Sequence, residues 1–381
     1  MKRYSSTLVL LIIVLSFSIW FSCENNLQKP TQPNETETTE LLNKDNPRIR
    51  SVMAVQDEYT ELLMKIPEVV GTATGLTEEG TPAILVLTKS AVAVASLQKG
   101  IPAKEALSKG QIPSFIQSIP VVIEVTGVIK PMRSTTPAVS HTAVQTPPIQ
   151  LGTSGGWRYD LANGYCCGGT LGALLTDGSN QYILSNYHVF MADIVLGGNN
   201  RVAAAGDPVI QPGLIDVQCN AASAQNVGTL VGIWSLPSSN VDAAIAQVIP
   251  GMVSTDGSIL EIGTLSSSTV GASINQNVKK SGRTTGLTRS RVTGLNASVS
   301  VQYEDECAGD VAFTKTFTGQ ILVRNRRSSF LNSGDSGSLM VEDVSSNPRA
   351  VGLLFAGSST IAIANPINEV LNYFSMSMVG N

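Results

Sequence analysis

The chain contains, at residues 332–339, the sequence NSGDSGSL, in which Ser336 stands between glycines. Glycine adopts positive φ angles at little cost, so the pattern predicts a tight turn that aims backbone amides at one point. We expect the amides of Gly334 and Ser336 to form an oxyanion hole there. A serine hydroxyl is a weak nucleophile until an imidazole accepts its proton, and that imidazole needs a carboxylate to fix its tautomer.

Two further segments supply an imidazole and a carboxylate. His188 ends an apolar run predicted to be a strand, and it is the only histidine after residue 155. Asp242 heads a second apolar strand, in the sequence VDAAIA at 241–246. We therefore predict that Ser336 is the nucleophile, His188 the general base and then acid, and Asp242 the group that orients His188. Three acids lie nearer to His188 but head no comparable strand: Asp193, Asp207 and Asp216.

These motifs resemble those of the chymotrypsin-fold (trypsin-like) serine proteases. GDSGS at 334–338 is similar to their nucleophile motif, SNYHV to their histidine motif, and CGGTL at 167–171 to one of their strands. The resemblance covers about residues 155–374. It implies a mainly β fold with two six-stranded antiparallel barrels and a C-terminal helix. Asn365 is a candidate N-cap for that helix, with Pro366 at its first position.

SGRTTG at 281–286 is similar to the bacterial branch that includes alpha-lytic protease, and a group of bacterial trypsin-like proteins shares KSGRTTG and GLLFAG segments. In that branch the arginine of the motif pairs with the aspartate before the nucleophile. The resemblance therefore implies an ion pair between Arg283 and Asp335. It also implies a specificity pocket with Phe330 at the floor and the segment from Phe355 to Gly357 along the wall. Because these positions carry no acid, we expect an apolar or shallow pocket.

The composition excludes several other classes of protein. The chain has 381 residues, of which 43% are apolar and 14% charged, with a net charge of −4. Such a chain is too apolar for a disordered protein, and it lacks the positive charge of a nucleic-acid-binding protein. Four cysteines remain after Cys23, and the sequence leaves their disulfide pairing open: Cys166, Cys167, Cys219 and Cys307. No spacing favours a metal site, and the proposed chemistry needs no cofactor.

The N-terminus has the pattern of an export signal. Lys2 and Arg3 precede an apolar run at 8–21, which is shorter than a membrane-spanning helix. Cys23 follows a small residue, as in a bacterial lipoprotein signal, so we expect a signal peptide at 1–22 and lipidation of Cys23. Ordinary cleavage nearby, which would give a secreted protein, is the alternative. Residues 23–50 are polar and predict a flexible tether to the cell envelope.

Residues 51–130 predict a small α/β module. Apolar residues recur at helical spacing from 52 to 66, and strand patterns follow at 69–74, 83–88 and 121–128. The Pro- and Thr-rich composition of residues 131–154 predicts a linker, and we expect His141 in it to be solvent-exposed. By analogy with the alpha-lytic branch, the module is a candidate pro-region in contact with the protease domain at 155–381. An accessory binding domain and a spacer are the alternatives.

The sequence thus predicts an exported, membrane-tethered serine endopeptidase that acts on proteins or peptides through an acyl-enzyme. The alternative is a catalytically silent surface binding or adhesion lipoprotein that retains the protease fold.

Overall fold

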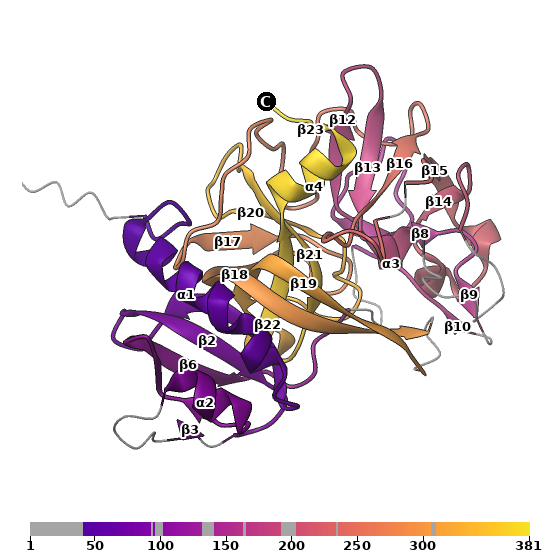
Figure 1. The fold of residues 1–381 in the computed structure, drawn as a ribbon. Helices are drawn as coiled ribbons and strands as arrows, with labels where there is room; N and C mark the ends of the chain where they lie inside the picture. Colours follow the sequence, from indigo (N-terminus) through magenta and orange to yellow (C-terminus); the bar gives the residue numbers. More distant parts are fainter. Residues whose placement is uncertain are drawn as a thin grey trace, which may run out of the picture. The chain divides into compact units, whose positions relative to one another are not determined.

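The computed structural model describes residues 41–92, 94–95, 102–131, 141–162, 165–191, 203–233, 235–305 and 310–381. Cys23 with its signal peptide, Cys307 and Asp193 therefore lie outside the described residues. The described chain is mainly β, with two curled antiparallel sheets, a C-terminal helix and an α/β module before them (Figure 1). This confirms the fold class expected from the sequence.

The N-terminal module packs one helix on a sheet. Helix α1 (Pro47–Met64) begins earlier than the apolar spacing predicted, because the Asn46 side chain accepts from the amides of Arg48 and Ile49 and Pro47 follows it. The remaining elements of the module are β1 (Val69–Leu76), β2 (Pro82–Thr88), β3 (Val94–Ala95), α2 (Ala103–Ser108), β4 (Ile112–Pro113), β5 (Phe115–Ile116) and β6 (Ile119–Val125). Strand β1 pairs antiparallel with β2, and β2 pairs parallel with β6.

The first barrel sheet has the strand order β11-β8-β14-β15-β16-β13-β12-β23. Its strands are β8 (Thr153–Trp157), β11 (Gly169–Leu171), β12 (Ala173–Thr176), β13 (Gln181–Ser185), β14 (Pro208–Gln211), β15 (Gln225–Leu230), β16 (Ala244–Val248) and β23 (Ser377–Met378). A short hairpin and three short helical segments decorate it: β9 (Leu161–Ala162), β10 (Tyr165–Cys166), α3 (Tyr187–Phe190), η1 (Leu214–Val217) and η2 (Ala221–Ser223). A disulfide joins Cys166 to Cys219, and Cys167 is also disulfide-bonded.

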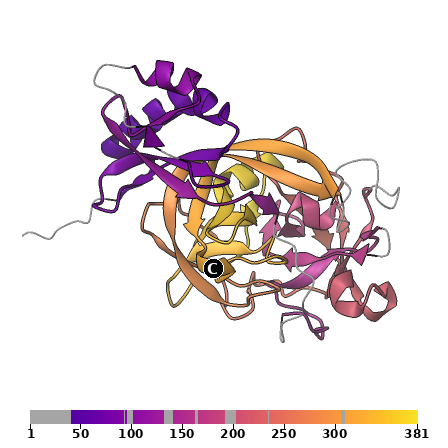
Figure 2. The same cartoon turned by 90° about the horizontal axis from the view of Figure 1, so that it is seen from below.

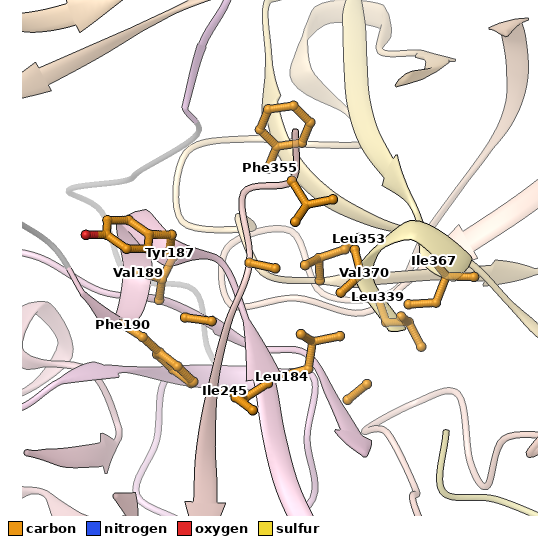
Figure 3. Packing of buried hydrophobic residues seen from close by; sticks show 14 of the residues in the cluster. Leu184, Tyr187, Val189, Phe190, Ile245, Leu339, Leu353, Phe355, Ile367 and Val370 are labelled. Atoms are coloured by element: carbon orange, nitrogen blue, oxygen red, sulfur yellow. The ribbon is translucent and has the colours of Figure 1, made fainter. Parts of the chain in front are cut away.

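The second barrel closes on itself because β17 pairs with both β20 and β18. Its elements are β17 (Asn277–Lys280), β18 (Thr288–Asp305), β19 (Asp310–Arg324), η3 (Arg326–Ser328), β20 (Leu339–Glu342), β21 (Ala350–Gly357), β22 (Ile361–Pro366) and α4 (Ile367–Phe374). Buried side chains of both barrels and of α4 form one cluster, which includes Leu184, Leu353 and Val370 (Figure 3). The two barrels therefore pack against each other through a shared apolar core.

The expected N-cap of the C-terminal helix is corrected. Helix α4 starts at Ile367 with Pro366 as its cap residue, and Asn365 is the last but one residue of β22. The Asn365 side chain is fully buried, where it accepts from the Asp242 amide at 3.0 Å and donates to Gln320 at 2.6 Å. Asn365 therefore joins the two barrels instead of capping the helix.

The module continues the sheet of the second barrel. Strand β1 pairs with β18, with Gly71 opposite Val299 and Thr72 opposite Ser298. The module therefore lies directly beside the long β18–β19 hairpin, as both views show (Figures 1 and 2). After the module, β7 (Lys130–Pro131) pairs antiparallel with Ala356 and Gly357 of β21.

The described part of the predicted linker is packed, and the expectation that His141 is solvent-exposed is wrong. His141 is only 5% exposed. Its Nδ1 lies 2.8 Å from the Gly152 carbonyl and its Nε2 lies 2.5 Å from Glu261 Oε2. Ile149 and Leu151 in the same segment are also buried. The prediction of a linker rested on the Pro and Thr content of the segment and gave no weight to these two apolar residues.

The close approach of β1 and β18 gives a stability test. An added Cβ on Gly71 would lie 2.8 Å from the Ser298 carbonyl oxygen and 2.9 Å from Val299 Cγ1. We expect Gly71→Ala to lower the free energy of unfolding by about 1–3 kcal/mol, because the strands must move apart. Gly271→Ala is the matched control, since an added Cβ there meets no atom within 4 Å. Equal unfolding free energies for the two variants in urea titrations would contradict this account of the docking.

Candidate active site

The pairing of β13 with β16 brings His188 and Asp242 together. The two strands are antiparallel, with Ser185 opposite Ala244, so the end of β13 lies beside the start of β16. His188 follows β13 by three residues and Asp242 precedes β16 by two. His188 Nδ1 and Asp242 Oδ2 are 2.6 Å apart, and both side chains are buried. The register of one strand pair therefore fixes a histidine–carboxylate contact between residues far apart in the sequence.

The Asp242 carboxylate receives donors on both oxygens. Oδ2 accepts from His188 Nδ1 and from the Tyr303 hydroxyl at 2.8 Å, whereas Oδ1 accepts from the Tyr187 amide at 2.8 Å. Burial and the neighbouring Asp242 carboxylate raise the pKa of the Tyr187 phenol to about 12. These hydrogen bonds hold the buried carboxylate in place beside His188. It can then stabilise an imidazolium at His188, while Nε2 of the same ring is the nitrogen available to proton chemistry.

The turn that carries Ser336 belongs to the second barrel but binds to the first. The Thr170 amide of β11 donates to the Ser336 carbonyl at 2.8 Å, and the Thr170 hydroxyl donates to the Gly334 carbonyl at 3.0 Å. Gly334 and Gly337 both have a φ of 92°. A Cβ on Gly337 would lie 2.3 Å from the Ser185 hydroxyl, so both the conformation and the space require glycine there.

Gly169 shows how near the two halves of the site approach. A Cβ on this residue would lie 2.6 Å from Val189 Cγ2 and 2.9 Å from the Ser336 carbonyl oxygen. Val189 follows His188 directly, so the histidine segment and the Ser336 turn both lie close to Gly169. The Ser336 hydroxyl donates to the Phe355 carbonyl at 3.3 Å. Ser336 thus lies at the junction of the two barrels, which is also where His188 and Asp242 lie.

The expected ion pair between Arg283 and Asp335 is wrong. Arg283 instead binds Asp216 with two parallel contacts of 2.6 Å, from Nε to Oδ2 and from Nη2 to Oδ1, and both side chains are buried. The physical reason is that Arg283 faces the first barrel. The Arg283 amide donates to the Thr170 hydroxyl of the first barrel, and its side chain binds Asp216 of the same barrel. Asp216, set aside above as an alternative triad member, has this structural role.

Asp335 pairs with Lys280, a residue that the sequence reasoning missed. Lys280 Nζ lies 3.2 Å from Asp335 Oδ2, and neither side chain is exposed. The register of β17 with β20 places Lys280 opposite Met340, close to the end of the turn. Burial lowers the pKa of Lys280, and the Asp335 carboxylate opposes that shift. The same carboxylate accepts from three amides and a hydroxyl: those of Thr284, Thr285 and Asn332, and Oγ1 of Thr285.

The residues expected to form the specificity pocket lie in the second barrel, and their surroundings are as follows. The Phe330 and Phe355 rings are both buried but belong to different apolar clusters, and Phe355 packs on Phe317 at 4.9 Å between centroids. The backbone of Gly357 pairs with Lys130 of β7. The edge of β21 beside Ser336 is thus occupied by the segment that follows the module.

Sequence signals existed for only part of what was missed. Lys280 lies in the quoted KSGRTTG segment, so its place in a recognised motif was a signal, although the motif did not identify Asp335 as its partner. Tyr303 lies in a long strand without a motif, and nothing in its spacing marked it. Within the described residues, no helix is long and apolar enough to cross a membrane, and no cluster of metal-ligating side chains occurs.

The buried Lys280–Asp335 pair makes a prediction about stability. We expect Lys280→Met to cost about 3–5 kcal/mol of unfolding free energy, because it leaves the Asp335 carboxylate buried without its cation. Lys279→Met is the control, since the neighbouring Lys279 ammonium donates to the Val344 carbonyl and pairs with no carboxylate in the described part of the chain, so its loss should cost about 1 kcal/mol. Urea unfolding of both variants measures the difference. Similar losses would show that the Lys280–Asp335 pair does not hold the turn.

Comparisons with known proteins complete the description of the site. A family model described as the Nal1 C-terminal domain matches residues 238–364, a range that includes Asp242 and Ser336. No curated protein matches the chain. Among solved structures, the chain is similar to a glutamic acid specific serine protease at 20% identity and a TM-score of 0.40, over 60% of this chain and 100% of that one. It is similar to Thermobifida fusca Protease A at 20% identity and a TM-score of 0.40, over 61% and 99%. It is also similar to an alpha-lytic protease homolog, N4, at 19% identity and a TM-score of 0.38, over 60% and 98%.

Proposed function

We propose that this chain is a serine endopeptidase whose nucleophile is Ser336, whose base is His188 and whose orienting acid is Asp242. The observation that carries the proposal is the buried contact of 2.6 Å between His188 Nδ1 and Asp242 Oδ2, placed at the junction to which the Ser336 turn is bound. A histidine held through Nδ1 by a buried carboxylate presents Nε2 as a base, which is what a serine nucleophile requires.

The reaction proceeds with groups of the chain and water. Ser336 Oγ attacks the scissile carbonyl while His188 Nε2 accepts the hydroxyl proton, and the amides of Gly334 and Ser336 stabilise the oxyanion. His188 then gives that proton to the leaving amine, and the acyl group stays on Ser336 as an ester. A water molecule attacks the ester, gives a proton to His188, and releases the acid and the free serine.

We also propose that the module at 51–130 is a pro-region. Support comes from β7, because Lys130 and Pro131 occupy the edge of β21 next to Phe355, whose carbonyl contacts the Ser336 hydroxyl. An extended peptide binds most simply by adding a strand to such an edge. The described chain would thus hold its own site covered until the module is removed. The Cys166–Cys219 disulfide supports export to an oxidising compartment, and anchoring through Cys23 is proposed on the signal alone.

Active-site labelling tests the function. We expect a fluorophosphonate probe to label the wild-type protein and not Ser336→Ala, and His188→Ala to label at least about a thousandfold more slowly. Ser333→Ala is the control in the same turn, because only backbone atoms of Ser333 take part in its hydrogen bonds. Labelling is measured on the full chain and after removal of the module. A wild-type protein that stays unlabelled in both forms would overturn the proposal in favour of a silent surface-binding protein.

Mass spectrometry of the active protein tests the pro-region. We expect the mature chain to begin between Pro131 and His141, since His141 is buried against Glu261 and belongs to the protease. Purified wild-type protein should gain labelling activity as this shorter chain accumulates, and Ser336→Ala should stay full-length if cleavage is autocatalytic. An active preparation in which the chain from Cys23 to Asn381 is intact would contradict removal of the module.

A further inference from the structure

We propose that Tyr303 is a positioning residue for the catalytic base, because its hydroxyl donates to the same carboxylate oxygen of Asp242 that holds His188. This inference rests on the proposed function of the triad. It adds a residue that no motif indicates and that comes from β18, the strand on which the module docks.

The geometry at Asp242 Oδ2 is defined by two donors. The Tyr303 hydroxyl lies 2.8 Å from this oxygen and His188 Nδ1 lies 2.6 Å from it. Oδ1 is bound by the Tyr187 amide. Rotation of the carboxylate would therefore break bonds on both oxygens at once. With Tyr303 1% exposed and Asp242 fully buried, water is excluded as a substitute donor.

Packing fixes the Tyr303 ring. Its centroid lies 6.3 Å from that of Phe317 on the neighbouring strand and 6.1 Å from that of His188, with the His188 ring inclined at 64°. The ring therefore contacts the base itself as well as the acid that orients it. Removing only the hydroxyl would preserve this packing, so a Tyr303→Phe variant isolates the hydrogen bond.

The hydrogen bond has a defined electrostatic effect. Two phenols interact with the Asp242 carboxylate among the described residues: the Tyr303 hydroxyl donates to Oδ2, and the charge of Asp242 acts on Tyr187. The Tyr303 donor stabilises negative charge on Oδ2. Without that donor the carboxylate would attract a proton on His188 more strongly, which raises the pKa of the imidazole. The carboxylate would also lose a restraint on its orientation. For the Tyr303→Phe variant, the two effects predict slower labelling of Ser336 and a higher pH midpoint of that labelling.

The experiment compares Tyr303→Phe with Tyr182→Phe. Tyr182 donates its hydroxyl to the Asp177 carboxylate at 2.7 Å, so the control removes the same kind of bond at a site outside the triad. The readout is the second-order rate of fluorophosphonate labelling from pH 5 to 9. We expect Tyr303→Phe to label about tenfold more slowly at its plateau, with the midpoint shifted to higher pH, and Tyr182→Phe to match the wild type.

A second measurement separates this inference from the proposed function. The chain has two histidines, so the titration of His188 can be followed directly by NMR with ¹⁵N-labelled histidine, with a His141→Gln variant for assignment. A raised His188 midpoint in Tyr303→Phe supports the inference, even if the probe labels neither the wild type nor any variant. Absence of labelling would refute only the proposed protease function. Unchanged labelling and an unchanged midpoint in a protein that is labelled at Ser336 would overturn the role of Tyr303. A slower rate with an unchanged midpoint would likewise reduce Tyr303 to a packing residue and overturn it.

Discussion

The site depends on one buried carboxylate. Asp242 is fully buried, and a charge in that position is tolerated only where donors surround it. Those donors come from both barrels: His188 and the Tyr187 amide from the first, and Tyr303 from the second. The Asp242 amide is bound by Asn365 of the second barrel as well. The same few hydrogen bonds therefore orient His188 and hold the two barrels together.

The motifs predicted the mainly β fold and the residues that the structure brings to the barrel junction, because each motif joins a strand end to a chemically required residue. His188 and Asp242 meet because an antiparallel register carries the end of one strand to the start of the next. The partner of Arg283 could not be predicted in the same way. Its amide and its side chain both bind the first barrel, at Thr170 and Asp216, and such contacts between barrels have no local signal in the sequence. The same holds for His141, which composition assigned to an exposed linker although Glu261, far away in the sequence, binds it.

Two buried ion pairs lie near the barrel junction. Lys280 neutralises Asp335 within the second barrel, whereas Arg283 spans from the second barrel to Asp216 of the first. Both pairs are buried, so each costs desolvation that only its partner and its additional hydrogen bonds offset. The loop at 281–286 follows Lys280 and contains Arg283, and Thr284 and Thr285 of this loop bind the Asp335 carboxylate next to Ser336. The Ser336 turn is thus bound to this loop through Asp335, and the loop is in turn bound to the first barrel through Arg283.

One edge of strand β18 pairs with two different strands, β17 and β1. Its first residues pair with β17 and close the barrel, and residues 295–299 of the same edge pair with β1 of the module. If the module leaves, the amides and carbonyls of that second stretch lose their partners in the middle of a long strand. Open edges of this kind are templates for strand addition. If the module is removed as we propose, the same event that uncovers the edge of β21 would also open this stretch of β18 to pairing with another chain.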